Sequence, residues 1–206
     1  MITSDYNFVP HWDILEEKKS HIEDIEGIEV DLNGKAVHVG KIAPGCRSCF
    51  HRRSIGIGTT TQLGRKCNLN CSYCLDGKKD NEIPVRKIKN RMSRWYRKSL
   101  DSGRRFWGFA FSNGEPLLYL KRMEKVTDLL KDIEKNTGVP LWNKVYTNGT
   151  LADEETLKKL KDFGIKELRF HPSASNFSDT VYRNMETASK MGFVVAVEEA
   201  AYPLNR

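Results

Sequence analysis

The 206-residue sequence lacks several features that define common protein classes. No apolar run approaches the ~18–20 residues needed to span a bilayer. The first residues, MITSDYNFVPHWD, contain neither the basic segment nor the apolar segment of a secretory signal. No repeat and no low-complexity tract is present. These absences argue against a secreted or membrane protein, so we expect a cytoplasmic protein without a membrane partner.

Cysteine is absent from most of the chain, and all five cysteines fall within residues 46–74. They are Cys46, Cys49, Cys67, Cys71 and Cys74. An odd number of clustered cysteines, in a chain without a visible secretory signal, argues against a disulfide framework. Thiolates that lie close together in a reducing compartment usually bind metal. The sequence therefore predicts a metal site in this segment.

The composition is that of a folded protein, with 39% hydrophobic, 30% charged and 10% aromatic residues. Residues 1–54 carry a small net negative charge and form an N-terminal extension in our interpretation. It contains a predicted hairpin over residues 28–42, with a turn at Asn33-Gly34, and the Cys-x2-Cys loop. Residues 55–206 form the second part, with one sizeable core.

From residue 55 onward, the pattern alternates between strands and helices. Strands are predicted at residues 55–63, 106–112, 141–147, 165–171 and 193–202. The helices between them begin at Pro84 and cover residues 120–133, 153–163 and the segment from a cap at Ser178 to Gly192. This alternation predicts an α/β fold with a parallel sheet or barrel.

The last predicted strand ends close to residue 206, which leaves no room for a sixth strand after it. We therefore expect an open sheet of five strands in sequential order, with an exposed edge at residues 193–202. The N-terminal extension or a partner chain would cover this edge, or the chain is a fragment of a longer enzyme. In such folds the functional site lies at the carboxyl ends of the strands.

Cys67, Cys71 and Cys74 follow the first of these strands with Cys-x3-Cys-x2-Cys spacing. Three thiolates on a short loop can bind three corners of a 4Fe–4S cluster, which normally takes four cysteines. The fourth iron would then be open to a small molecule, as the open position of a catalytic zinc site is.

This spacing, with Tyr73 before the last cysteine, resembles the radical S-adenosylmethionine (radical SAM) superfamily. SNGEPLL at residues 112–118 is similar to the Gly-Gly-Glu motif of that family, with Asn113 in place of the first glycine. YTNGTL at residues 146–151 is similar to its Thr-Asn-Gly segment. The resemblance covers residues 55–203 and implies an open partial (βα) barrel of about five strands.

The resemblance also implies roles for individual residues. Cys67, Cys71 and Cys74 would bind the 4Fe–4S cluster, and S-adenosylmethionine would chelate the open iron. Tyr73 would lie beside the adenine, and Asn113, Gly114 and Glu115 would bind the methionyl ammonium. Thr147 and Asn148 would line the same pocket. Arg169 or His171 would bind the methionyl carboxylate or the ribose, and Glu198 would bind the ribose hydroxyls. Asparagine is the non-glycine residue that best tolerates a positive φ, so Asn113 can replace the glycine.

Simpler interpretations exist for single motifs. Glu115-Pro116 could open a helix, Asn148-Gly149 could form a turn, and His171 could simply end a strand. Cys46 and Cys49 could bind a second metal, form a redox couple, contribute to substrate handling or be buried thiols. Together with Cys71 and Cys74 they could instead form a zinc ribbon, which would make the protein an RNA-binding module without catalytic activity.

The implied function is that of an oxygen-sensitive enzyme which cleaves S-adenosylmethionine reductively and forms a 5′-deoxyadenosyl radical that takes hydrogen from a substrate. A flavodoxin- or ferredoxin-like protein would supply the electron. The substrate stays open among a peptide or protein, a small molecule and RNA. Residues 78–105 carry eleven Lys or Arg and three acids, which suits RNA, although a solvated amphipathic helix face is the simpler explanation of this charge.

Overall fold

The computed structural model describes residues 26–31, 36–39, 57–74, 82–101, 106–138 and 140–198. Contacts divide the chain into two units, Met1–Phe50 and His51–Arg206, which are described separately. Within the described residues, no helix combines the length and the apolar character that crossing a membrane requires.

The first unit contains the predicted hairpin. Strands β1 (Ile28–Asp31) and β2 (Ala36–Val39) pair in antiparallel fashion, with Asp31 opposite Ala36. This register is centred on residues 33 and 34, where the sequence predicts the turn. The turn itself, Cys46 and Cys49 lie outside the described residues, so the hypotheses about these two cysteines stay predictions.

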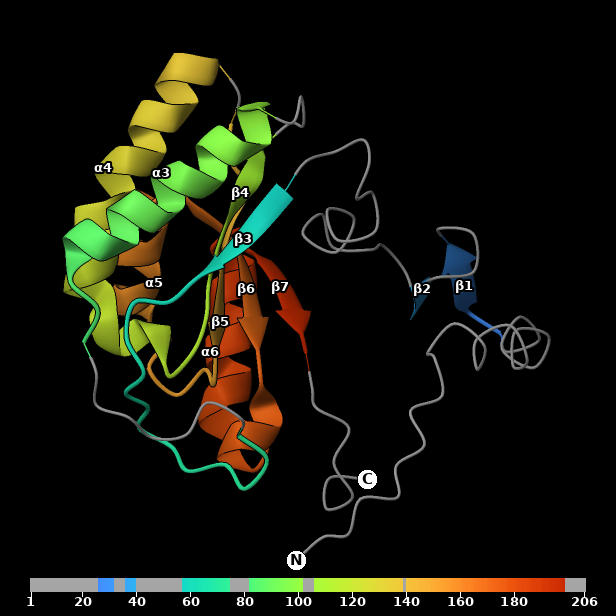
Figure 1. The fold of residues 1–206 in the computed structure, drawn as a ribbon. Helices are drawn as coiled ribbons and strands as arrows, with labels where there is room; N and C mark the ends of the chain where they lie inside the picture. The colour runs from blue at the N-terminus through green and yellow to red at the C-terminus, as the bar shows by residue number, and fades with distance from the viewer. Residues whose placement is uncertain are drawn as a thin grey trace, which may run out of the picture. The chain divides into compact units, whose positions relative to one another are not determined.

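The second unit is built on a parallel five-stranded sheet in sequential order, as predicted (Figure 1). Its strands are β3 (Ile57–Thr61), β4 (Phe106–Phe111), β5 (Asn143–Thr147), β6 (Ile165–Phe170) and β7 (Val194–Val197). Among the described residues, β7 pairs only with β6, so it is an edge strand there. Whether the N-terminal extension covers this edge stays a prediction.

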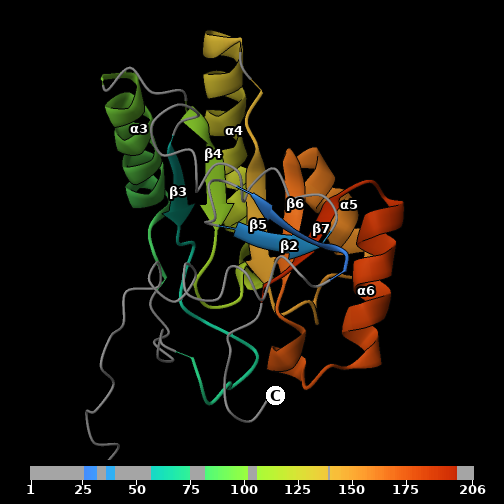
Figure 2. The same cartoon turned by 90° about the vertical axis from the view of Figure 1, so that its right-hand side faces the viewer.

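Four helices connect the strands and cover one side of the sheet (Figures 1 and 2). They are α3 (Val85–Asp101), α4 (Leu120–Thr137), α5 (Glu154–Asp162) and α6 (Asp179–Lys190), with short 3-10 helices η1 (Pro116–Tyr119) and η2 (Pro172–Ser175) after β4 and β6.

Two predicted helix starts agree with the structure to within one residue. Helix α3 begins one residue after Pro84, whose carbonyl accepts hydrogen bonds from the N–H groups of Lys87 and Ile88. Ser178 occupies the N-cap position of α6, as predicted, but its side chain forms no capping hydrogen bond, and its hydroxyl lies 3.2 Å from that of Ser175.

The two faces of the sheet differ in chemistry because side chains alternate along each strand. Val145, Leu168 and Phe170 point into an apolar core shared with the helices. On the opposite face, Lys144 is paired in register with Glu167, and Tyr146 with Arg169. A polar face is unusual for a parallel sheet, whose strands are normally apolar on both sides. This face and the carboxyl ends of the strands therefore carry the chemistry.

Candidate functional site

The loop after β3 carries the three cysteines and is held in place by the segment after β4. The backbone N–H of Glu115 donates to the carbonyl of Lys66 at 2.8 Å. The N–H of Lys66 donates to the buried hydroxyl of Tyr119 at 2.7 Å. A side chain at Gly64 would lie 2.3 Å from the Tyr119 ring, so only glycine fits there. The start of the loop is therefore a fixed support rather than a free connection.

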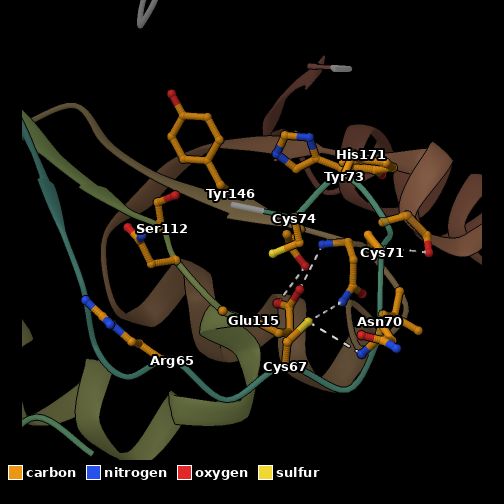
Figure 3. A pocket seen from close by; sticks show the side chains of 16 residues that line it. Arg65, Cys67, Asn70, Cys71, Tyr73, Cys74, Ser112, Glu115, Tyr146 and His171 are labelled. Atoms are coloured by element: carbon orange, nitrogen blue, oxygen red, sulfur yellow. Dashed lines mark hydrogen bonds between the residues drawn. The ribbon is translucent and has the colours of Figure 1, made fainter. Parts of the chain in front are cut away.

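A cavity of about 270 Å³ lies between this loop and the strand ends (Figure 3). Ten of its lining residues were expected from the sequence: Cys67, Cys71, Tyr73, Cys74, Asn113, Gly114, Glu115, Thr147, Asn148 and His171. The others are Arg65, Leu69, Asn70, Ser112, Tyr146 and Ala174. The fold thus brings together residues that lie more than one hundred positions apart in the chain.

The three cysteines are free thiols with different exposure. Cys67 and Cys71 are half-buried and Cys74 is exposed. The Cys67 sulfur accepts a hydrogen bond from the N–H of Leu69 at 3.4 Å, and the amide nitrogen of Asn148 lies 3.9 Å from it. Burial raises the pKa of the Cys67 thiol, and the nearby Glu115 and Cys71 add to this, although the two N–H donors oppose it.

Glu115 is the most buried charged group at the cavity, with 1% of its surface exposed. Its Oε1 accepts hydrogen bonds from the N–H of Leu117 at 3.0 Å and the hydroxyl of Thr147 at 2.8 Å. Its Oε2 accepts one from the N–H of Asn148 at 2.8 Å. Burial raises the pKa of Glu115 despite these three donors. A carboxylate has about four acceptor positions, so one on Oε2 is left for a ligand.

The residues before Glu115 explain why the motif tolerates Asn113. Asn113 has φ +75° and Gly114 has φ +58°. Asparagine reaches this left-handed region more readily than other non-glycine residues. No other residue can replace Gly114 without a clash, because a Cβ at this position would lie 2.5 Å from the carbonyl oxygen of Lys66. Glu115 also caps η1 through Leu117, so the simple helix-start interpretation holds beside the ligand-binding one.

Asn148 and Tyr73 tie the cysteine loop to two other strand ends. The side chain of Asn148 donates to Asn68 Oδ1 at 2.9 Å, and Asn68 donates to Thr150 at 2.9 Å. The hydroxyl of Tyr73 lies 2.8 Å from that of Ser173 in η2. Sequence analysis missed Asn68 and Ser173, because neither belongs to a motif and their partners are about 80 and 100 positions away.

Tyr146 is a further cavity residue that the sequence analysis missed. Its ring is stacked with that of His171 at 6.1 Å, and the Arg169 guanidinium lies 5.4 Å from its centre. Its position directly before Thr147, on the strand face opposite to Thr147, was the signal available in the sequence. Tyr146 therefore connects the cavity with the polar face of the sheet.

Arg169 and Glu198 do not line the cavity. Arg169 donates to Glu167 Oε1 at 2.8 Å and to Glu198 Oε2 at 2.7 Å. Glu167 is fully buried and also accepts from the Trp142 indole at 2.7 Å. These ion pairs form a row on the polar face next to the cavity. The expected roles of Arg169 and Glu198 toward a nucleoside stay predictions.

The donor set fits the iron–sulfur cluster that the resemblance implies. All three thiols line one cavity, and N–H donors to the Cys67 sulfur favour its thiolate form. Among the described residues, no three His, Cys, Asp or Glu side chains lie close enough together to bind a single metal ion. A 4Fe–4S cluster takes one thiolate at each of three irons, so its ligands lie around it rather than at one point. Glu115 fits a cationic group next to that position.

Comparisons with known proteins agree with this site. A model of the radical SAM superfamily matches residues 61–200. An uncharacterized protein of Methanocaldococcus jannaschii is 33% identical over 106 residues, which are 51% of this chain and 35% of that protein. The serine-type anaerobic sulfatase-maturating enzyme of Klebsiella pneumoniae is 30% identical over 106 residues, which are 50% of this chain and 26% of that enzyme. The chain thus matches only about a third or less of the length of these relatives.

The fold is also similar to solved structures. The structure of anSMEcpe with bound AdoMet and the Cp18Cys peptide has a TM-score of 0.54 and 21% identity, over 68% of this chain and 42% of that chain. A likeness at this identity shows the fold alone. The family model, in contrast, covers more than half of the sequence and includes the cysteine loop and both strand-end motifs. The chain belongs to the radical SAM superfamily.

Proposed function

We propose that this chain is the catalytic core of an enzyme that binds a 4Fe–4S cluster through Cys67, Cys71 and Cys74 and S-adenosylmethionine in the adjoining cavity. When bound, the reduced cluster would supply one electron to the sulfonium, and the resulting 5′-deoxyadenosyl radical would take hydrogen from a substrate. The observation that carries this proposal is the convergence of three thiols, a buried carboxylate and two strand-end motifs on one cavity.

The chain's own residues would bind and orient S-adenosylmethionine. The open acceptor position on Glu115 Oε2 suits the methionyl ammonium, and the backbone at Asn113 and Gly114 lies beside it. Tyr73, Thr147, Asn148 and His171 would line the rest of the binding site, with Tyr73 beside the adenine. Arg169 and Glu198 are proposed for the nucleoside side, next to Tyr146. Because Glu115 and Asn148 are already bonded to each other, binding would need little rearrangement.

For the substrate, we propose a peptide or a protein side chain. The support is the likeness to a sulfatase-maturating enzyme, which is 30% identical over half of this chain. Arg169 pairs with Glu167 and Glu198 beside the cavity, and the exposed carboxylate of Glu198 would suit a polar substrate. A small molecule is the second candidate. A flavodoxin- or ferredoxin-like protein is proposed as the electron donor.

Metal and sulfide analysis tests the cluster assignment. The chain, purified and reconstituted without oxygen, should contain about four iron and four sulfide ions at this site. It should also convert S-adenosylmethionine to methionine and 5′-deoxyadenosine with a strong reductant. Replacing Cys67, Cys71 or Cys74 with Ala should abolish both. Stoichiometric zinc without sulfide would instead support the zinc ribbon.

The double variant Cys46→Ala/Cys49→Ala is the matched control, because it removes two thiols from outside the proposed ligand set. It should retain the iron, the sulfide and the cleavage of S-adenosylmethionine. Loss of the cluster in this variant would show that the ligands have been assigned to the wrong cysteines.

A further inference from the structure

The α-helices that the structure describes in the second unit differ sharply in charge. Helix α3 contains seven Lys or Arg and one acid, whereas the basic and acidic residues number five and four in α4, three and three in α5, and two and two in α6. In α5 and α6 the charges form i,i+4 ion pairs, such as that of Lys158 with Glu154 at 2.7 Å. Among the described residues, no ion pair includes a cation of α3.

The cations of α3 are gathered on one side of the helix. Ile88, Met92 and Ser99 are buried against the rest of the unit. At 100° per residue, the exposed residues other than Leu100 fall within an arc of about 140° on the opposite side, and Leu100 lies about 40° outside it. We call this arc the α3 basic face, and it consists of Arg86, Lys87, Asn90, Arg91, Arg94, Arg97, Lys98 and Asp101. It contains six cations and one carboxylate.

The stability of the helix does not explain this arrangement. Arg86 and Lys87 lie in the first turn, where the helix dipole disfavours positive charge, and this turn contains no acid. Cations three and four positions apart, such as Lys87, Arg91 and Arg94, repel one another by a few tenths of a kcal/mol per pair. This unfavourable pattern occurs on one helix, whereas charge is nearly balanced on α4, α5 and α6. The difference indicates a partner of opposite charge.

Geometry and composition indicate which kind of polyanion would bind. Lys87, Arg91, Arg94 and Lys98 follow one another over about 16 Å of helix axis, a length that corresponds to about five phosphates of one nucleic-acid strand. Leu100, the exposed apolar residue of α3, lies beside this face rather than within it, whereas the centre of a protein interface is normally apolar and aromatic. The apolar side of α3 is buried, so the helix cannot insert into a lipid surface.

An aromatic ring borders the cations. Trp95 is half-buried at the edge of the α3 basic face, and the Lys98 ammonium lies 5.2 Å from its ring centre. Proteins that bind single strands without sequence preference combine a row of cations with aromatic rings on which bases stack. A hollow lined by Asn90, Arg94, Arg97, Lys98 and Asp101 adds a concave part to this surface.

We propose that the α3 basic face binds single-stranded nucleic acid through its phosphate backbone, largely independently of sequence. The binding lies outside the cavity of the proposed reaction and does not depend on that reaction. Arginine guanidinium groups would form paired hydrogen bonds with phosphate oxygens, and the lysines would contribute point charges.

Fluorescence anisotropy with a labelled 20-nucleotide poly(U) RNA tests the proposal on the full, reconstituted chain. Between 50 and 200 mM KCl the affinity should fall about a hundredfold, because four to five phosphate contacts give a logarithmic salt slope of about −3. The triple variant Arg91→Gln/Arg94→Gln/Lys98→Gln should bind at least tenfold more weakly, with a slope of about −1. Glutamine has a helix propensity close to that of Arg and Lys, so α3 should stay folded, which a thermal melt would verify.

The variant Lys158→Gln/Lys159→Gln/Lys190→Gln is the matched control, since it removes three exposed positive charges from α5 and α6. It should bind the RNA within a factor of about three of the unmodified chain. An equal loss in both variants would overturn the proposal, because the effect would then reflect net charge alone. Absence of RNA binding at 50 mM KCl would overturn it, as would displacement of the RNA by an equal charge concentration of poly-glutamate, which would favour an acidic protein partner.

Discussion

Glu115 and Asn148, from the ends of neighbouring strands, are joined by a 2.8 Å hydrogen bond from the backbone N–H of Asn148 to Oε2 of Glu115. This bond links the two strand-end motifs directly. It also fixes the carboxylate in the cavity lining, close to Cys67 and Cys74 of the cysteine loop (Figure 3). Glu115 thus helps to hold the two strand ends together, and its Oε2 retains one further acceptor position.

Glu115→Ala should destabilise the unit by about 2–4 kcal/mol. The substitution leaves the N–H groups of Leu117 and Asn148 and the hydroxyl of Thr147 without their acceptor in a buried place. Urea unfolding under anaerobic conditions would measure this change. Glu155→Ala, which removes an exposed carboxylate, should change stability by less than about 0.5 kcal/mol. Equal effects of the two substitutions would contradict the role of Glu115.

The pH dependence of stability should change when Glu115 is replaced by Gln. Burial raises the pKa of Glu115, so the folded protein holds this proton at pH values where the unfolded chain has released it. The resulting stabilisation is complete below the ordinary pKa of about 4.5 and is lost as the pH rises through the folded pKa. The stability of Glu115→Gln relative to the unmodified chain should therefore increase from pH 4.5 upward. A difference that stays constant over this range would refute the raised pKa.

Gly114→Ala should be much more damaging than Gly138→Ala. Both glycines have a positive φ, +58° and +65°, which costs an L-residue about 1–2 kcal/mol. A Cβ at Gly138 meets open space, whereas one at Gly114 would clash with the carbonyl of Lys66. We expect a loss of about 1 kcal/mol at Gly138 and of 3 kcal/mol or more at Gly114 in urea unfolding. Similar losses of stability in the two variants would mean that the loop at Lys66 moves to accommodate the methyl group of the Gly114→Ala variant.

Asn113→Gly should retain the site, because glycine adopts the φ of +75° found at this position without strain. Asn113→Ala should destabilise the unit by about 1 kcal/mol. Binding of S-adenosylmethionine, measured by calorimetry on the reconstituted protein, should follow the same order. If the Asn113→Ala variant is as stable as the Asn113→Gly variant, the tolerance of asparagine for a positive φ does not explain its presence at this position.

The cap of α5 offers a test away from the cavity. Asp153 accepts a hydrogen bond from the N–H of Thr156 at 2.8 Å, and this bond lowers the pKa of Asp153. Asp153→Ala should cost about 1 kcal/mol at neutral pH, and Asp153→Asn only a fraction of this. The carboxylate's contribution is present above its ordinary pKa of 3.8 and is lost as the pH falls through the lower folded value. Thermal melts at a series of pH values from 7 downward would show whether the difference between the Ala variant and the unmodified chain shrinks as the carboxylate becomes protonated.

Tyr146→Ala should weaken the binding of S-adenosylmethionine several-fold, whereas Tyr146→Phe should have a smaller effect. The ring forms one wall of the cavity and stacks with His171, and phenylalanine keeps this ring. Calorimetry on the reconstituted variants would separate the two outcomes. Equal affinity of the Ala variant and the unmodified chain would remove Tyr146 from the binding site.

The local pattern of the sequence was sufficient for much of the fold and for the motif residues. Alternating apolar strands and amphipathic helices predicted five sequential parallel strands, and glycines marked the helix ends at Gly164 and Gly192. Cys67, Glu115 and Thr147 were found because each belongs to a short motif near the carboxyl end of a strand. These features depend only on residues that are close together in the sequence, so the sequence alone predicts them.

Only the tertiary structure decided which other side chains meet at the cavity. Asn68 reaches Asn148 and Tyr73 reaches Ser173 because parallel strands bring all their carboxyl ends to one edge, whatever the distance along the chain. The structure also placed Arg169 in a row with Glu167 and Glu198 rather than in the cavity lining. Sequence spacing determines which face of a strand a residue occupies, but the partner across the sheet depends on register, which is set when the strands pack together.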